Sequence, residues 1–227
     1  MTKAEFHAIE NHMLRLMRDS AHDRHHIYRV LNLAVDIAAT CEGVDADILL
    51  AACLLHDIGR ERQRQDVRLC HAREGGEMAY ELLLSLGWAA ERAAHVRACI
   101  SSHRFRGDNP PESIEAKILF DADKLDVCGT IGIARTLIYA GQIGAPLYVP
   151  DGKGGFLTER GGDDSSSFFQ EYHYKLSRLY DVFYTDRARA LAQQRRRAAE
   201  DFYTSLYSEV AQTYGVGEIL LEQTLRG

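Results

Sequence analysis

Apolar residues recur along most of this chain at intervals of three and four positions, which is the spacing of one helix face. The pattern runs from Phe6 to Met17 and again from Ile27 to Ile37. It predicts further helices over about 44–57, 71–86, 88–103, 111–122, 130–141, 165–181 and 183–211. We therefore expect an all-α protein built as a helical bundle.

Glycine and proline interrupt this helical pattern. Gly43, Gly59 and Gly87 fall at predicted helix ends, and Pro110-Pro111 is placed to open the helix that runs into residue 120. One stretch, near 145–163, has no helical period, is rich in glycine and contains only two short apolar patches. We expect a loop or a small hairpin there, and the sequence leaves open whether it acts as a lid.

Composition and charge narrow the functional classes. Hydrophobic residues make up 46% of the chain, which is enough for a sizeable core. A net charge of −6 provides no basic surface for duplex nucleic acid or an anionic membrane. The longest apolar run, at 48–55, is far shorter than the ~20 residues of a membrane span. The five cysteines include no C-x-x-C pair, so we expect a cytoplasmic protein in a reducing compartment.

One of the apolar helices ends abruptly in two polar residues. The run "LLAACLL" leads directly into His56 and Asp57, and buried polar groups cost free energy unless they have partners. Two other predicted helices carry residues of the same types, His26 and Asp123. Two imidazoles and two carboxylates form a ligand set that suits Mn, Fe, Ni, Co, Mg or Zn. The alternative is a hydrogen-bonded His–Asp network without a metal.

Two further histidines stand at predicted helix ends. His71 opens the helix in "CHAREGGEMAYELL", and His103 closes the helix in "ISSHRFRGD". If both lie near Asp57, its carboxylate could bridge two metals roughly 3.5–4 Å apart. The sequence therefore indicates one or two metal ions per chain, with a capping or core hydrogen bond as the alternative role for these two histidines.

Taken in order, these residues resemble the HD superfamily of metal-dependent phosphohydrolases, in its small stand-alone bacterial branch. The resemblance rests on an ordered set of stretches over about 22–135: "HHIYRV", "LLHDIG", "CHAREGG", "ISSHRFR" and "ILFDADKLDVCGTIGIAR". It implies a single HD domain over 1–227, with C-terminal helices from 165 to 227 packed on the motif core. By this resemblance His26 is the ligand rather than His25 or His22, and Asp123 rather than Asp121.

The resemblance also suggests roles for residues beyond the metal ligands. His71 and His103 match positions that bind a second metal or a substrate phosphate in some members. A phosphate would need cations near the ligands, for which the candidates are Arg104, Arg106, Lys124 and Lys175. Asp57 would orient the reactants, and Glu61 could hold the attacking water. For the four cations and Glu61, the alternative is a solvated surface position.

The function implied is hydrolysis of a phosphoester or phosphoanhydride in a nucleotide or related small metabolite. The spacing of the residues alone indicates only a metal site. A mixed-valent di-iron oxygenase would use all six ligands and is one alternative, and a non-catalytic nucleotide-sensing module is another. Homodimer formation is left open by the sequence.

Overall fold

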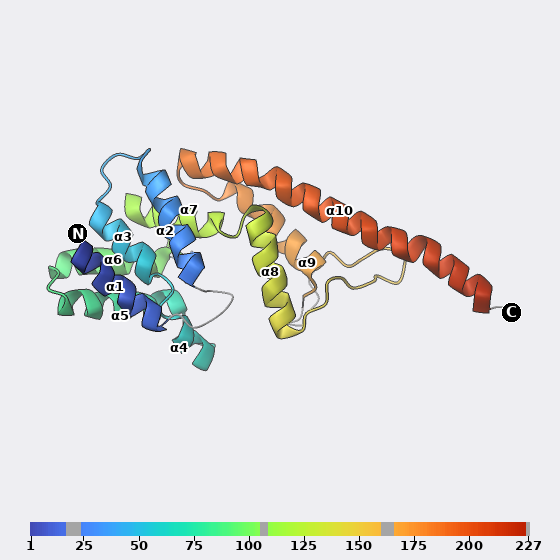
Figure 1. The fold of residues 1–227 in the computed structure, drawn as a ribbon, viewed down its shortest axis with the longest axis horizontal. Helices are drawn as coiled ribbons and strands as arrows, with labels where there is room; N and C mark the ends of the chain where they lie inside the picture. Colours follow the sequence, from blue (N-terminus) through green and yellow to red (C-terminus); the bar gives the residue numbers. More distant parts are fainter. Residues whose placement is uncertain (17–23, 105–108, 160–165, 226–227) are drawn as a thin grey trace. The chain divides into compact units, whose positions relative to one another are not determined.

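The computed structural model describes residues 1–16, 24–104, 109–159 and 166–225, and over these residues it confirms the all-α prediction (Figure 1). Its helices are α1 (Lys3–Leu16), α2 (Arg24–Ala38), α3 (Ala46–Leu55), α4 (Arg60–Gln65), α5 (His71–Ser85), α6 (Ala90–Ser102), α7 (Ile114–Leu125), α8 (Gly129–Ile143), α9 (Phe168–Tyr174), the 3₁₀ helix η1 (Leu176–Asp181) and α10 (Asp186–Leu225). No helix among the described residues is both long and apolar enough to cross a membrane.

The chain separates into two compact units. Unit 1 comprises Met1–Asp126 with Phe183–Ala190, and unit 2 comprises Val127–Val182 with Leu191–Gly227. The long helix α10 therefore begins in unit 1 and continues in unit 2. The prediction of a single domain over 1–227 stays a prediction.

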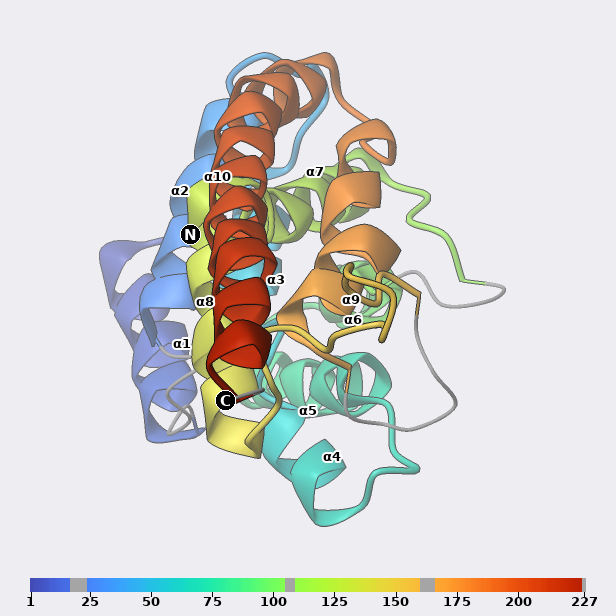
Figure 2. The ribbon, with the colours of Figure 1, turned by 90° about the vertical axis from the view of Figure 1, so that its right-hand side faces the viewer.

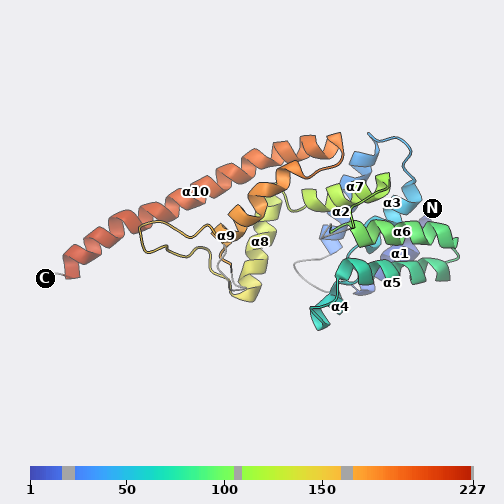
Figure 3. The same cartoon turned by 180° about the vertical axis from the view of Figure 1, so that it is seen from behind.

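Helix α3 forms the centre of unit 1. It is buried on nearly all sides, from Ile48 to Leu55, and it packs against α1, α2, α6 and α7. Asp45 caps its N-terminus by accepting hydrogen bonds from the backbone N–H groups of Asp47 and Ile48. Helices α5 and α6 lie side by side next to this core (Figure 3). Because α3 is surrounded in this way, the residues that directly follow it, His56 and Asp57, are also buried.

Unit 2 contains α8, α9, η1 and most of α10 (Figure 2). Its core is aromatic. Phe168 and Phe169 of α9 are buried, and the ring of Tyr172 stacks on that of Tyr203 with 3.9 Å between ring centroids. Helix α9 starts with a capping box. The Ser167 hydroxyl accepts a hydrogen bond from the Gln170 backbone N–H, and the Gln170 side-chain oxygen accepts one from the Ser167 backbone N–H. The stack of Tyr172 on Tyr203 attaches α9 to α10 within the unit.

The glycine-rich stretch predicted near 145–163 is a loop with one narrow turn. An isolated antiparallel bridge joins Pro150 to Phe156, and the Leu157 N–H donates to the Val149 carbonyl over 2.9 Å. The described part of the stretch contains no longer strand, and residues 160–163 lie outside the described residues.

Three helix predictions need correction. The short helix α4 was not predicted, because its sequence "RERQRQ" has no apolar period. The helix predicted over 165–181 is divided into α9 and η1 at Lys175, whose backbone leaves the helical region with φ −123° and ψ −59°. The last helix continues to Leu225 rather than ending at 211. For the other helices, the predicted and observed ends differ by a few residues. Helix α7, for example, begins after its cap Ser113 rather than at Pro110-Pro111.

Candidate metal centre

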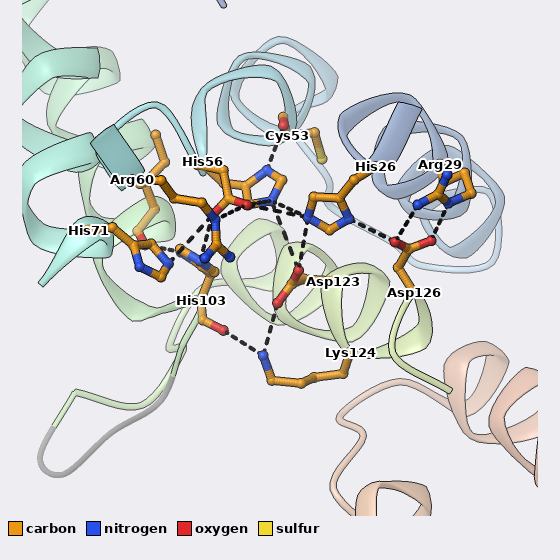
Figure 4. A network of polar contacts seen from close by, with 12 residues as sticks. His26, Arg29, Cys53, His56, Arg60, His71, His103, Asp123, Lys124 and Asp126 are labelled. Atoms are coloured by element: carbon orange, nitrogen blue, oxygen red, sulfur yellow. Dashed lines mark hydrogen bonds and ion pairs between the residues drawn. The ribbon is translucent and has the colours of Figure 1, made fainter. Parts of the chain in front are cut away.

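Six side chains predicted for the site come together inside unit 1, and all six are buried. They lie at the N-terminal part of α2, the end of α3, the start of α5, the end of α6 and the last turn of α7 (Figure 4). They are His26, His56, Asp57, His71, His103 and Asp123. The convergence follows from the packing of unit 1, because the other four helices carry these side chains to the buried end of α3.

The six residues form two groups of three. In each group the ligand atoms lie within 4.8 Å of one another, so each could hold a metal ion. The first group is His26, His56 and Asp123, with 3.3 Å between the two imidazole Nε2 atoms. Asp123 Oδ1 lies 3.5 Å from His26 Nε2. Ring nitrogens and a carboxylate oxygen thus point into one small space.

The second group consists of Asp57, His71 and His103. Asp57 Oδ1 lies 3.5 Å from His71 Nε2 and 3.7 Å from His103 Nε2. The other oxygen of the same carboxylate, Oδ2, lies 3.4 Å from His26 Nε2. Asp57 therefore presents one oxygen to each group, which is the arrangement of a carboxylate shared between two metal positions.

Two buried polar atoms of the second group lack a hydrogen-bond partner among the described residues. Asp57 Oδ1 and His71 Nε2 are buried, and neither makes a hydrogen bond within the described part of the chain. Buried polar atoms in folded proteins nearly always have partners. A cation between these atoms would satisfy both, so the residues present fit a metal ion.

A close approach of backbones brings His71 to Asp57. Gly59 follows the His-Asp pair and packs on the start of α5, so a Cβ atom there would lie 2.5 Å from the Gly75 nitrogen and closer still to the His71 carbonyl oxygen. The φ angle of Gly59 is ordinary, −81°. Glycine is therefore needed at this position for its lack of a side chain and not for its conformational freedom.

The second ring nitrogen of each histidine has its own partner. Nδ1 of His56 lies 2.8 Å from the Cys53 carbonyl oxygen, and Nδ1 of His103 lies 2.6 Å from the Ile100 carbonyl oxygen. A carbonyl oxygen can only accept, so Nδ1 carries the proton in both rings. The lone pair of each is therefore on Nε2, the atom that faces the centre.

Burial sets the protonation of most of these groups. Desolvation lowers the pKa of His71 to about 2 and that of His103 to about 3, and it lowers the pKa of His56 as well. Burial also lowers the pKa of His26, but its hydrogen bonds to Asp126 and Asp57 outweigh this effect and raise it. Three of the four imidazoles are thus neutral and able to bind a metal.

The two carboxylates stay ionised in spite of their burial. Desolvation alone would raise the pKa of Asp57, but Arg60 and the hydrogen bond with His26 hold it well below its usual range. Lys124 and His26 do the same for Asp123. Ionised oxygens facing neutral imidazoles are the state in which hard divalent metals are bound.

Among the residues that the structure describes, three cations contact the ligands of the centre. The Arg60 Nε donates to Asp57 Oδ2 over 2.5 Å, and Lys124 Nζ donates to Asp123 Oδ2 over 2.9 Å. Arg104 Nη1 lies 3.3 Å from His71 Nδ1. Lys124 and Arg104 were predicted, whereas Arg60 was missed, although its position three residues after Asp57 would place it one helical turn away.

No contact with the six candidate ligands is described for Glu61, Lys175 or Arg106. Glu61 is on the exposed side of α4, where it pairs with Arg64 over 2.6 Å. Lys175 belongs to unit 2 and pairs there with Glu171. Arg106 lies outside the described residues. The roles of Glu61, Lys175 and Arg106 stay predictions. Of the two alternatives to His26, His22 also lies outside the described residues and His25 is exposed.

Comparison with known proteins identifies the family. A model of the HD domain matches residues 24–128. YpgQ of Bacillus subtilis is 34% identical over 195 residues, which span 84% of this chain and 85% of YpgQ. The chain belongs to the HD superfamily. The resemblance seen in the sequence is thereby confirmed, and each candidate ligand lies within the residues that the HD model matches.

Several solved structures share the fold over most of their length. A protein from Lactobacillus plantarum superposes with a TM-score of 0.76 at 26% identity, covering 93% of this chain and 99% of its own. YpgQ in complex with ADP has a TM-score of 0.71 at 31% identity, covering 90% and 97%. An HD-superfamily hydrolase from Bacillus thuringiensis has a TM-score of 0.68 at 28% identity, covering 91% and 97%. These likenesses support a hydrolase.

Proposed function

We propose that this HD protein is a metal-dependent hydrolase of a phosphoester or phosphoanhydride bond in a nucleotide or related small metabolite. The observation that carries the proposal is the pair of buried three-residue groups linked by Asp57. Two adjacent cation positions sharing one carboxylate suit a phosphoryl group, whose attacking and leaving oxygens both need charge stabilisation.

The chain's own residues would hold the ions and the substrate. His26, His56 and Asp123 would hold one metal, and Asp57, His71 and His103 a second. When bound, the metal would lower the pKa of a water molecule and polarise a phosphoryl oxygen. The ionised Asp57 carboxylate would accept a hydrogen bond from the attacking water and so orient it.

Cations next to the ligands would hold the phosphate. Lys124 is partly exposed and lies beside Asp123, and Arg104 lies beside His71. Both could donate hydrogen bonds to phosphate oxygens and neutralise the charge that develops during cleavage. Arg60 adds a third cation, which would exchange its contact with Asp57 for one with the substrate when a metal is present.

A nucleotide is favoured as substrate because the related YpgQ has been crystallised with ADP. Cleavage of a nucleoside triphosphate to monophosphate and pyrophosphate, release of a terminal phosphate, and opening of a cyclic nucleotide are all compatible with the centre. A release assay separates them by product.

A second candidate function is that of a di-iron oxygenase, because the six ligands could hold two irons. Metal analysis of protein purified without chelators, followed by assay of phosphate and pyrophosphate release across nucleotides, tests both functions. We expect anaerobic activity with Mn²⁺ or Co²⁺ and no oxygen uptake. Oxygen uptake by iron-loaded protein, without phosphate release, would support the oxygenase instead. Metal-independent nucleotide binding without turnover would favour a sensing module.

Substitutions at the His-Asp pair test the site directly. His56→Ala and Asp57→Ala should abolish metal binding at the affected group and reduce turnover by about 100-fold or more, with the helical circular dichroism retained. His25→Ala is the matched control, since His25 is exposed next to His26, and it should behave as wild type. Full metal occupancy in either site variant would contradict the assignment.

A further inference from the structure

The two candidate metal groups differ in the partners of the histidine Nδ1 atoms, which point away from the centre. Behind His26, on the side away from the centre, lies a carboxylate: Asp126 Oδ2 is 2.8 Å from His26 Nδ1 (Figure 4). Asp126 is fully buried. Arg29 holds it from the other side, donating from Nε to Oδ1 over 2.6 Å and from Nη2 to Oδ2 over 3.0 Å. The carboxylate is therefore ionised and fixed in place.

The histidines of the second group have no such anion among their described partners. His103 Nδ1 faces the neutral carbonyl of Ile100. His71 Nδ1 faces the amide oxygen of Gln63 at 2.6 Å and the Arg104 guanidinium at 3.3 Å. An anion that accepts from one imidazole nitrogen makes the opposite nitrogen a better electron donor than a neutral carbonyl or amide oxygen does, because its negative charge adds to the effect of the hydrogen bond.

We propose that Asp126 is a positioning residue for His26 and makes the group His26, His56 and Asp123 the tighter of the two metal positions. Asp126 accepts a hydrogen bond from the N–H at His26 Nδ1. It thereby keeps the proton on Nδ1 and the lone pair on Nε2, the atom that lies 3.5 Å from Asp123 Oδ1. It also fixes the plane of the ring. The inference rests on the metal centre proposed above. It adds that the first group binds its metal ion at a lower metal concentration than the second group does.

The ion pair with Arg29 explains how such a carboxylate is kept in the interior. A buried charge needs a partner, and the fork of a guanidinium can engage both carboxylate oxygens at once. Arg29 is about one-third exposed and Asp126 about 1% exposed, so the cation reaches solvent while the anion faces the imidazole. Because Arg29 and His26 lie three residues apart on α2, one turn of helix presents both to the same carboxylate.

Metal titration of chelator-treated protein tests the inference. Co²⁺ added to the wild type, followed by visible absorption and calorimetry, should give two binding steps. Asp126→Asn preserves the shape of the side chain and removes its charge, so it should weaken the first step about 10–100-fold and leave the second unchanged. Gln63→Ala is the matched control behind His71, and it should affect only the second step.

The outcomes separate this inference from the proposed function. Wild-type protein that binds no Co²⁺ would overturn the metal centre itself. Two intact steps in Asp126→Asn, or equal weakening of both, would overturn the role of Asp126 and leave the metal centre standing.

A measurement on unsubstituted protein guards against a variant that fails to fold. Nitrogen-15 spectra of the metal-free wild type at alkaline pH should show His26 with its proton on Nδ1. A proton on Nε2 would overturn the proposal.

Discussion

Asp121 and Asp123 stand two residues apart on α7 and serve different purposes. Side chains two positions apart on a helix point to nearly opposite sides. Asp123 faces the histidines, whereas Asp121 accepts hydrogen bonds from the backbone N–H groups of Tyr184 and Thr185, over 2.9 and 2.8 Å, and from the Thr185 hydroxyl. Thr185 in turn accepts from the Ala188 N–H in the first turn of α10. Asp121 thus anchors the start of α10.

Asp121→Ala should destabilise the protein without affecting metal binding. The substitution leaves two backbone donors and a buried hydroxyl without their acceptor, which we expect to reduce the free energy of unfolding by about 2–4 kcal/mol. Thr185→Ala, the milder control, should cost about 1 kcal/mol. Urea unfolding measures stability and Co²⁺ titration measures affinity, and loss of metal from Asp121→Ala would contradict this division of roles.

The metal-free protein should lose stability on acidification, in part through His71. The unfolded chain takes up a proton near the ordinary pKa of 6.5, while burial and Arg60 keep the folded His71 neutral down to about 2. Unfolding therefore becomes easier as the pH falls below about 6.5. From about pH 7.5 to about 5.5 this contributes about 1.4 kcal/mol.

Urea unfolding with chelator, comparing wild type with His71→Asn, isolates this contribution. The variant should lose less stability over the same interval, because asparagine does not titrate. His26, whose pKa is raised, acts in the opposite direction but is present in both proteins. Identical pH dependence of the two proteins would show that His71 is not held neutral.

At the scale of secondary structure, the contact between the turn after α3 and the start of α5 decides whether the second metal group exists. His71 is the first residue of α5, so its position follows that of the helix. Gly59 allows this helix to approach closely. A single missing Cβ atom therefore determines the distance between His71 and Asp57.

Gly59→Ala should displace α5. The added Cβ would meet backbone atoms of His71 and Gly75, which cannot yield as a flexible side chain would, so we expect about 3 kcal/mol of destabilisation and selective weakening of the second metal step. Gly141→Ala is the control, since Gly141 lies within α8 with no atom near the added Cβ. It should be neutral or stabilising by up to about 1 kcal/mol. Normal Co²⁺ binding in Gly59→Ala would contradict this account.

On the scale of the whole molecule, a bound metal would tie together segments distant in sequence. The first group joins α2, the end of α3 and α7, all of which belong to unit 1. A ligand that binds only the folded state stabilises it, by about 2.7 kcal/mol when its free concentration is 100 times Kd.

Chelation should therefore lower the melting temperature of unit 1 by about 5–10 °C, and Mn²⁺ or Ni²⁺ should restore it. Differential scanning calorimetry measures the shift. Asp123→Ala, which lacks a ligand of the first group, should respond much less to either treatment. If the melting temperature does not change although the metal content has been shown to fall, metal binding does not stabilise the folded protein.

Much of the fold and of the site could be predicted from local patterns. Most helices follow the apolar period. The six candidate ligands stand near the ends of predicted helices, and the resemblance to the HD superfamily selected His26 and Asp123 from the histidines and aspartates beside them.

Asp126 and Gln63 were missed because nothing in their local sequence distinguishes them from solvated polar residues. Arg60 was missed although its spacing of three residues from Asp57 was a usable signal. The break at Lys175 was missed for a similar reason, since no glycine or proline marks it.

The sequence by itself determined the helical class, the resemblance to the HD superfamily and the residue types of the centre, because these depend on short-range periodicity and on ordered motifs. Only the tertiary structure decided how the ligands divide into two groups, that Asp57 presents one oxygen to each, and that Asp126 stands behind His26. These relations join residues up to a hundred positions apart, and their distances are set by the packing of α2, α5, α6 and α7 around the end of α3. Packing of this kind depends on three-dimensional contacts that no local pattern encodes.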